Sequence, residues 1–415
     1  MTVLIAGAGI AGLSLGLTLH QIGIPFRIFE AVREVKPLGV GINLQPTAVR
    51  ELYELGLEDL LDEVGLPTQD YGFYTRTGKK IWSEPRGRAA GYHWPQYSVH
   101  RGLFQVALHD ALVARAGADC IVTGARAVGY ENTPDGVTLQ LETADGPRTE
   151  AGDLLIAADG IHSALRAQMY PTEGAPIWGG AVLWRGTTRA RPFLTGASMA
   201  LAGNDWQRFV SYPITRPDAD GMATINWIAE LKYDADAAWK KEDWNRRANL
   251  DEFLPLFEGW TFDWLDVPDL IRRAETVYEY PMVDRDPVPT WLDGRVALIG
   301  DAAHATYPVG SNGASQAIVD ARVLGAMMQT QGATQAALTA YNDELCGPVS
   351  KVVLANRGSG PDAIMQMVED RCEGDFSRMD AVMSEAEKAE HAAKYKALAG
   401  LSIDALNAQP PRITV

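Results

Sequence analysis

The first strand, turn and helix of the chain constrain its fold more than any other stretch. Residues 2–6 are β-branched or apolar, residues 7–12 read G-A-G-I-A-G, and "LSLGLTLHQIGI" continues with helical periodicity. In this spacing Gly7 allows a tight turn, Gly9 lets a pyrophosphate approach the backbone, and Gly12 lets the helix pack closely on the strand. The N-terminus of such a helix attracts negative charge.

Glu30 completes this unit. It lies eighteen residues after Gly12, at the end of the predicted strand "PFRIFE", where a carboxylate accepts hydrogen bonds from a ribose diol. Tight packing of a helix on a strand can require the same glycines, but here strand, helix and acid occur together in order. The unit therefore predicts dinucleotide binding. No basic residue precedes the apolar run, so we interpret it as part of the fold and not as a signal peptide.

Length and charge narrow the class of protein. A chain of 415 residues is too long for one ordinary core, which favours two joined domains and a helical extension. The net charge of -16 disfavours nucleic acid and anionic membranes as partners, and no other apolar run is long enough to span a bilayer. Cys120, Cys346 and Cys372 fit neither a disulfide framework nor a metal site, which favours a cytoplasmic location. HExxH and CxxC motifs are missing from the sequence, so we predict no metal site, and we predict no hydrolase chemistry.

Two further glycine-rich strand ends follow far along the chain. In "DLLIAADGIHSALR" an apolar strand leads into Asp159 and Gly160, and then into a helix with Ser163 and Arg166. In "RVALIGDAAHATYPVGSNGASQA" another strand leads into Gly300 and Asp301 and a glycine-rich loop before the next helix. Such a loop can be a plain connection. A nicotinamide dehydrogenase does not need additional glycine-rich loops for one ligand, so the three strand ends favour a longer dinucleotide.

The three motifs together resemble the FAD-dependent aromatic hydroxylases of the para-hydroxybenzoate hydroxylase fold, the group A flavoprotein monooxygenases. The stretches "KPLGVGINLQPTAVRELYELGL", "IWSEPRG", "WPQYSVHRG" and "YPMVDRDPVP" are similar to the methylphenazine-carboxylate monooxygenase branch. The resemblance ends near Arg357. In the tail that follows, residues 384–401 look like an amphipathic, solvated helix.

The resemblance implies an α/β fold: a Rossmann-like FAD-binding domain, a second antiparallel-sheet substrate domain and C-terminal helices. We expect the FAD-binding domain at residues 1–70, 97–172 and 285–325. The substrate domain is expected at residues 71–96 and 173–284, and the C-terminal helical region at residues 326–415.

The resemblance also implies the residues that bind FAD. Asp301 is expected to bind a ribityl hydroxyl, Arg101 the phosphate or ribityl region, and Val128 the adenine through its backbone. The backbone from Gly310 to Ala314 is expected against the flavin edge, where a helix N-terminus stabilises negative charge. Asp159 either serves the fold and the nicotinamide path or simply caps a helix. The full set is Gly7, Gly9, Ile10, Ala11, Gly12, Glu30, Ala31, Gly41, Ile42, Arg101, Val128, Asp159, Asp301, Pro308, Gly310, Asn312, Gly313 and Ala314.

Aromatic residues are frequent in the predicted strands of the substrate domain: "GAVLWRGTT", "WQRFVSYPI", "MATINWIAEL" and "AETVYEYPM". Most strand aromatics fill a core, but some can line a flat apolar pocket. We expect Trp184, Tyr212, Trp227 and Tyr278 at the substrate. Arg185 can bind a substrate carboxylate bidentately, although a solvent-facing arginine is an equally good interpretation.

By this resemblance the chain is an NAD(P)H-dependent and FAD-dependent monooxygenase. It would hydroxylate an aromatic or N-heteroaromatic small molecule, a class that includes carboxylated, phenazine-like compounds, through a flavin C4a-hydroperoxide, with O₂ and NADH or NADPH as co-substrates. No catalytic acid or base is predicted, because the protein's task is to place the ring and exclude water. A flavin-linked dehydrogenase or reductase is the alternative, and a non-catalytic flavoprotein a third reading. We expect a monomer or homodimer.

Overall fold

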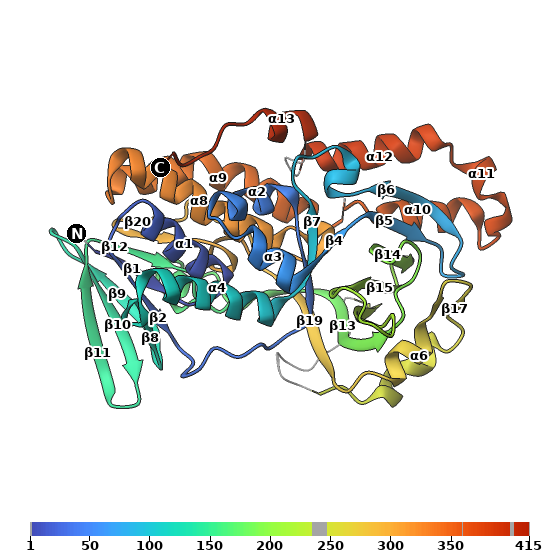
Figure 1. Cartoon of the computed structure of the whole chain (residues 1–415), viewed down its shortest axis with the longest axis horizontal. Helices are drawn as coiled ribbons and strands as arrows, with labels where there is room; N and C mark the ends of the chain where they lie inside the picture. Colours follow the sequence, from blue (N-terminus) through green and yellow to red (C-terminus); the bar gives the residue numbers. More distant parts are fainter. Residues whose placement is uncertain (1, 235–246, 359, 399–401, 415) are drawn as a thin grey trace.

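The computed structural model describes residues 2–234, 247–358, 360–398 and 402–414. Two main sheets lie toward opposite sides of the molecule, and the C-terminal helices run along its top in the view of Figure 1. The mixed α/β class predicted from the sequence, with a Rossmann-like part, an antiparallel sheet and C-terminal helices, is confirmed.

A six-stranded sheet contains all three glycine-rich strand ends. Its order is β20-β21-β12-β1-β2-β8, and every neighbouring pair is parallel except β20 with β21. Because parallel strands end at the same edge, their carboxyl ends bring the three motifs together. The strands are β1 (Val3–Ala6), β2 (Phe26–Glu30), β8 (Ile121–Thr123), β12 (Leu154–Ala157), β20 (Leu292–Asp293) and β21 (Val296–Leu298).

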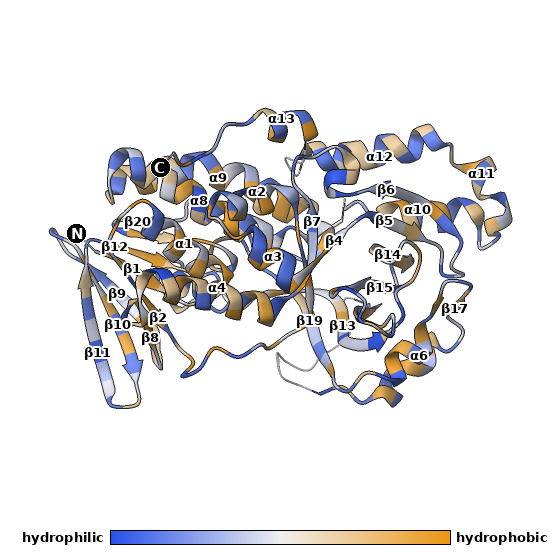
Figure 2. Ribbon diagram, viewed as in Figure 1, coloured by the Kyte–Doolittle hydropathy of each residue, from blue (hydrophilic) through white to orange (hydrophobic). Residues whose placement is uncertain are grey.

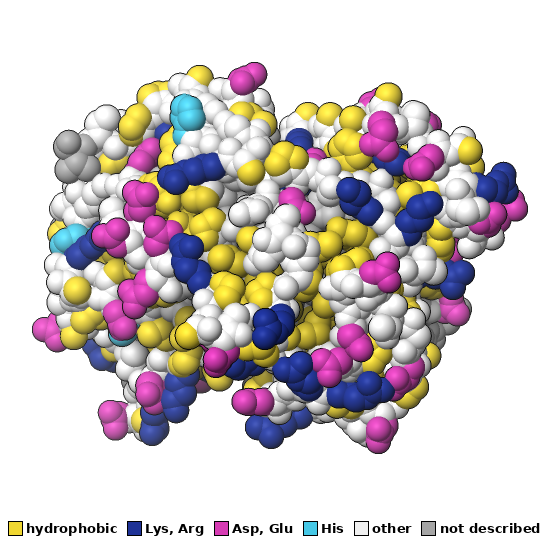
Figure 3. All heavy atoms as spheres, turned by 45° about the vertical axis from the view of Figure 1, so that its right-hand side comes forward, with side chains coloured by type: hydrophobic (Ala, Val, Ile, Leu, Met, Phe, Trp, Pro, Cys, Tyr) yellow, Lys and Arg dark blue, Asp and Glu magenta, His cyan; other side chains and the backbone are white. Residues whose placement is uncertain are grey.

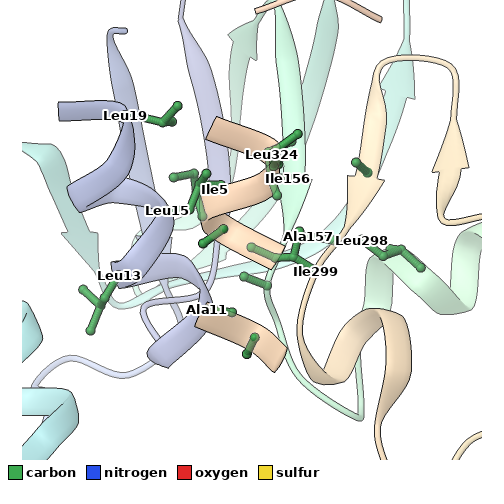
Figure 4. Close-up of a cluster of buried hydrophobic side chains, with 14 of the residues drawn as sticks. Ile5, Ala11, Leu13, Leu15, Leu19, Ile156, Ala157, Leu298, Ile299 and Leu324 are labelled. Atoms are coloured by element: carbon green, nitrogen blue, oxygen red, sulfur yellow. The ribbon is translucent and has the colours of Figure 1, made fainter. Parts of the chain in front are cut away.

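Helices α1 (Ile10–Gln21) and α8 (Gly313–Gln331) pack beside this sheet. Their apolar side chains, among them Leu15 and Leu324, meet Ile5 and Ile156 in one buried cluster (Figure 4). Figure 2 colours these inner segments largely orange, as expected for elements buried on the sheet. Nearby helices are α2 (Pro46–Glu54), α3 (Glu58–Val64), α4 (Arg101–Ala116), α5 (Ala164–Met169), α7 (Asp301–His304) and α9 (Gln335–Ala355).

A seven-stranded sheet forms the second layer, in the order β19-β13-β16-β15-β14-β5-β6. All neighbours are antiparallel except β14 with β5. The four strands predicted from aromatic-rich stretches are present, and β14 is an additional one. The strands are β5 (Asp70–Tyr74), β6 (Lys80–Pro85), β13 (Ile177–Ala190), β14 (Ser198–Gly203), β15 (Gln207–Pro213), β16 (Ala223–Lys232) and β19 (Val277–Asp284).

Three small sheets complete the strands: β3 (Gly41–Leu44) with β4 (Gly65–Thr68) and β7 (Gln96–His100); β9 (Ala125–Asn132) with β10 (Val137–Thr143) and β11 (Gly146–Gly152); and β17 (Thr261–Phe262) with β18 (Leu265–Asp266). Helix α6 (Val267–Arg272) follows β18. The 3₁₀ helices are η1 (Gly87–Ala90), η2 (Ala118–Cys120), η3 (Leu250–Glu252), η4 (Leu254–Phe257), η5 (Val309–Ser311) and η6 (Phe376–Arg378).

The tail after Arg357 folds back onto the rest of the chain. It contains α10 (Ala363–Cys372), α11 (Met379–Val382), α12 (Glu385–Leu398) and α13 (Ile403–Ala408). Apolar residues of α10 pack on one face of the seven-stranded sheet. Beyond α13, the guanidinium of the buried Arg50 donates to the Gln409 side chain. The helix expected over residues 384–401 is present as α12, whose Lys388 is buried, and residues 399–401 of that prediction lie outside the described residues.

Strand membership supports the three-part division expected from the sequence, which we keep as a proposal. The seven-stranded sheet takes its strands from residues 70–85, 177–232 and 277–284, whereas residues 3–30, 121–123, 154–157 and 292–298 supply the six-stranded one.

Candidate active site

A cavity of about 350 Å³ lies where the two main sheets approach each other. Its wall includes residues from all three glycine-rich strand ends and from one face of the seven-stranded sheet. Figure 3 shows hydrophobic side chains gathered in a hollow across the middle of that face of the molecule. From the predicted set the cavity is lined by Gly9, Ile10, Ala11, Gly41, Ile42, Arg101, Asp301, Pro308, Gly310, Gly313, Ala314, Arg185 and Tyr212.

The first glycine loop leaves its backbone open toward this cavity. Gly7 has a φ of +103°, and a Cβ there would collide with the carbonyl of Ala158. A Cβ at Gly12 would likewise collide with the carbonyl of Gly7. By contrast, a Cβ at Gly9 would meet nothing within 4 Å, and Gly9 precedes the first residue of α1. Two glycines therefore serve packing, and the third leaves room for an anion at the helix N-terminus.

Glu30 and Ala31 lie beside this loop, outside the cavity itself. One carboxylate oxygen of Glu30 accepts from the backbone N–H of Ala8 at 2.7 Å, and the other from Val32 at 2.9 Å. The carboxylate is thus fixed next to the loop, and each oxygen retains a further lone pair for a donor such as a ribose hydroxyl.

The loop after β21 forms the opposite wall. Asp301, the first residue of α7, is exposed within the cavity, and none of the described residues donates a hydrogen bond to its carboxylate. Gly310 has a φ of 70°, and the loop leads into α8 at Gly313. The side chain of Gln45 donates to the Gly310 carbonyl at 3.1 Å, and the backbone N–H of Gln45 donates to Ser315 Oγ at 2.9 Å. The loop is therefore anchored to the end of β3, with an unsatisfied helix N-terminus at the cavity.

Two buried side chains, those of Arg166 and Asp320, hold the segment after β21 in place by hydrogen bonds. The guanidinium of Arg166 donates to the carbonyls of Ala302 and Ala303 at 2.9 and 2.7 Å. The carboxylate of Asp320 accepts from the backbone N–H of Gly300 at 2.8 Å and lies 2.6 Å from Nε2 of His304. Burial lowers the pKa of His304, but the charge and hydrogen bond of Asp320 outweigh burial and raise it overall.

Arg101 is the first residue of α4 and is exposed where it lines the cavity. Its backbone N–H donates to the carbonyl of Val40 at 2.9 Å, next to Gly41 and Ile42 of β3. The motifs "GVGIN" and "VHRG" are thus side by side, because β3 pairs with β7, which ends at His100.

Besides Gly7, Gly12, Glu30 and Ala31, three further residues predicted at the cofactor do not line the cavity. Val128 is 38% exposed on β9. Asn312 precedes α8 and borders a neighbouring pocket of about 40 Å³. Asp159 lies behind Gly160 and accepts from the backbone N–H of Leu165 at 3.5 Å, which supports the helix-capping interpretation. Burial raises the pKa of the Asp159 carboxyl.

Arg185 is a cation with no carboxylate partner among the described residues. Its Nη2 donates to the carbonyl of Gly41 at 3.2 Å, while its Nε is buried without a hydrogen-bond partner. Burial lowers the pKa of its guanidinium, the charge of Arg101 lowers it further, and Tyr212 and Tyr280 act in the opposite direction. Burial also raises the pKa of Tyr212 to about 12, which keeps the phenol neutral at physiological pH. Arg185 thus contributes a positive charge to the wall, and no described carboxylate is paired with it.

Three aromatic residues expected at the substrate lie outside the cavity wall. Trp184 stacks on Phe253 with ring centroids 4.7 Å apart, and Trp227 donates to Thr188 Oγ1 at 3.0 Å; both belong to the core on the far side of the sheet. Tyr278 pairs with Arg185 and shares its face, but it lies beyond the cavity. The reason for the two tryptophans is the alternation of side chains along a strand: Leu183 and Arg185 face the cavity, so Trp184 faces the core.

Residues that the sequence analysis did not select form most of the substrate-side wall. Along their strands these residues alternate with core residues. This alternation is present in the sequence and could have identified them once one cavity residue of each strand was known. This part of the wall consists of Tyr71, Leu183, Met199, Leu201, Arg208, Val210, Ile228, Glu230 and Met282, with Asp362 from the tail.

Among the described residues, no group of three or more His, Cys, Asp or Glu side chains is arranged to hold a metal ion. No helix within the described ranges has the length and apolarity needed to cross a membrane.

Comparison with known proteins identifies the family of this architecture. The family model described as "FAD binding domain" matches residues 1–183 and 271–356. Phenazine 1,6-dicarboxylic acid hydroxylase PhzS of Lysobacter antibioticus is 42% identical over 361 residues, which are 86% of this chain and 89% of that protein. Aurachin C monooxygenase/isomerase of Stigmatella aurantiaca is 33% identical over 82% of this chain and 84% of its own.

Solved structures agree. HpxO of Klebsiella pneumoniae, in a structure complexed with FAD and uric acid, has a TM-score of 0.71 and 26% identity, with 98% of this chain and 96% of that chain covered. A salicylate hydroxylase in a substrate complex has a TM-score of 0.74 at 24% identity, with 99% and 98% covered, which shows the shared fold.

Proposed function

The chain belongs to the FAD-binding-domain family and is an FAD-dependent monooxygenase, and we propose that it hydroxylates a planar N-heteroaromatic carboxylate at the cavity between its two main sheets. We further propose NADH or NADPH as the reductant. The relatives named above are hydroxylases and monooxygenases, so a flavin-linked dehydrogenase or reductase is not favoured.

The observation that carries the substrate class is the unpaired guanidinium of Arg185. A cation that is partly removed from water, as the buried Nε of Arg185 shows, is costly unless an anion meets it, and no described carboxylate does so. A planar guanidinium matches a carboxylate in bidentate geometry. The 42%-identical relative is named for a phenazine dicarboxylic acid, which is both heteroaromatic and carboxylated. Arg185 therefore supports a substrate carboxylate as its missing partner.

The residues of the glycine-rich loops fit FAD. Gly9, Ile10 and Ala11 leave open backbone for a pyrophosphate, and Glu30 beside them suits a ribose. Asp301 has a free carboxylate for a ribityl hydroxyl, and the start of α8 at Gly313 offers N–H groups to an electron-rich ring edge. We propose these roles together with those of Arg101, Gly41 and Ile42 in the same cavity.

When bound, the flavin supplies hydride acceptance and the activation of O₂. The protein's own residues then place the substrate and exclude water. Arg185 fixes the carboxylate, and the apolar side chains of Leu183, Val210 and Ile228 on the same sheet face cover the ring. The neutral phenol of Tyr212 can donate a hydrogen bond beside Arg185. No acid or base residue is needed for this placement.

The proposal is tested with labelled oxygen. Phenazine, quinoline and pyridine carboxylates are screened for stimulation of NAD(P)H oxidation by the FAD-loaded protein, and the product is analysed by mass spectrometry after reaction under ¹⁸O₂. We expect one labelled oxygen atom in a ring hydroxyl, with the second oxygen reduced to water. An oxidised but unlabelled product would support the dehydrogenase reading instead.

A further inference from the structure

A second charged group faces the cavity on the same sheet as Arg185, and no step above uses it. Arg208 of β15, Glu230 of β16 and Asp362, just before α10, all line the cavity, with 14%, 12% and 9% of their side chains exposed. Arg208 pairs with Asp362 and Asp205, and its Nε lies 4.0 Å from Glu230. We call Arg208, Glu230, Asp362 and Asp205 the acidic cluster.

Strand register separates this cluster from Arg185. Arg185 pairs with Ile228, whereas Glu230 lies two residues further along β16, opposite Leu183 and Arg208. Two residues along a strand correspond to roughly 7 Å. The two charged groups therefore lie at different positions along one cavity wall.

The net charge of the acidic cluster is negative. One guanidinium faces three carboxylates, and its Nε also donates to the carbonyl of Asn204 at 2.9 Å. Burial raises the pKa of Glu230, but a neutral Glu230 would still leave two carboxylates against one cation. Lys232, the other cation near Glu230, lies over the Trp206 ring at the exposed end of β16. Arg208 thus already pairs with internal carboxylates, which outnumber its single positive charge.

We propose that the acidic cluster makes this enzyme select heteroaromatic monocarboxylates, because Glu230 and Asp362 repel a second carboxylate at the end of the substrate away from Arg185. This inference rests on the proposed function, since it takes Arg185 as the site of the first carboxylate. An uncharged edge, or one carrying a hydrogen-bond donor such as N–H or O–H, suits the carboxylate oxygens of this wall. The relative named for a phenazine dicarboxylic acid makes the difference testable with closely matched compounds.

The test compares phenazine-1-carboxylate with phenazine-1,6-dicarboxylate on the FAD-loaded enzyme at pH 8. Binding is measured by titration of the change in flavin absorbance. We expect the monocarboxylate to bind at least about tenfold more tightly, the effect of one poorly screened like-charge contact. Equal or tighter binding of the dicarboxylate would overturn the inference and leave the proposed function standing. If neither compound changes the flavin spectrum, the proposed function fails, and the inference fails with it.

Single substitutions test whether the acidic cluster causes the preference for a monocarboxylate. Glu230→Gln removes a cavity-facing charge with little change of shape, so it should tighten dicarboxylate binding by about three- to tenfold and change monocarboxylate binding little. Glu230→Asp keeps the charge and should keep the preference. The matched control is Asp205→Asn, which neutralises a carboxylate on the same arginine but outside the cavity wall. An equal change of preference in the Asp205→Asn and Glu230→Gln proteins would contradict a local effect of the cavity-facing charge.

Discussion

At the scale of single residues, the proposed substrate class depends on Arg185. Its guanidinium keeps one hydrogen bond, to the Gly41 carbonyl, and has no described anionic partner. Removing it should weaken binding of the substrate carboxylate much more than it affects folding, because no internal ion pair is lost.

Arg185→Gln should therefore raise the Kd of phenazine-1-carboxylate by about 10- to 100-fold, the range for a hydrogen bond to a charged group. The FAD content should stay at the wild-type level. Arg185→Lys, which keeps the charge but loses the bidentate fork, should be intermediate. The measurement is the same absorbance titration, and an unchanged Kd in Arg185→Gln would rule out this residue as the carboxylate site.

His304 gives a prediction on pH. Its folded-state pKa is raised above 6.5 by Asp320, so its contribution to stability is fully present below about pH 6.5 and is lost as pH rises through the folded-state value. His304→Gln should reduce the free energy of unfolding by about 1–3 kcal/mol at pH 6 and by less at pH 9. Urea denaturation of the FAD-loaded proteins at both pH values measures this, and a difference that grows with pH would contradict the assignment.

The aromatic residues mark the limit of prediction at this scale. Tyr212 and Arg185 were selected from the sequence and lie at the cavity, whereas Trp184 and Trp227 were selected for the same reason and lie in the core. Residue type could not separate them, since a ring is as useful in a core as at a ligand. The face of the strand on which each side chain lies does separate them. Once one residue of a strand is known to line the cavity, the alternation of side chains along that strand assigns the others to the cavity or to the core.

At the scale of elements, the loop from β21 to α8 has an unusual backbone and lines the cavity, where we propose that it contacts the cofactor. Gly310 has a positive φ, and Asp301 has a carboxylate without a described hydrogen-bond donor. Each makes a prediction of its own.

Asp301→Ala should purify with much less FAD than the wild-type protein, because the ribityl chain loses a charged hydrogen-bond acceptor worth about 1.5–3 kcal/mol. The ratio of flavin to protein absorbance reports occupancy, and Asp301→Asn should recover part of it. Full occupancy in Asp301→Ala would refute the role.

Gly310→Val forces a β-branched residue to a φ of 70°, at a cost of about 1–2 kcal/mol, and also places a side chain at the flavin edge. Gly332→Val is the matched control: Gly332 has a φ of 73° but lies past the end of α8, outside the cavity. Both should lower the melting temperature, and only Gly310→Val should lose FAD. Loss of FAD from both variants would attribute the effect to backbone strain alone.

Elements were the most predictable part of the molecule. The strand, glycine loop and helix at residues 3–21 follow from local spacing, and so do the strands that carry Asp159 and Asp301. Strand β14 was not predicted, because "SMALAG" has small residues and no strong alternation.

At the scale of the whole molecule, the sequence predicted that distant segments meet, because the carboxyl ends of parallel strands share one edge. It did not predict that the tail reaches the cavity. Asp362 lies beyond the matched family model and is joined to Arg208 by an ion pair across 154 positions of the chain. Such a contact leaves no local pattern, and only the folded chain reveals it.

The central claim is that one cavity holds both the flavin ring and a carboxylated substrate. A crystal structure of the FAD-loaded enzyme with phenazine-1-carboxylate tests it most directly. We expect the isoalloxazine between residues 41–42 and 308–314, with the substrate carboxylate on Arg185. A flavin ring seated elsewhere, or a carboxylate turned away from Arg185, would contradict the claim.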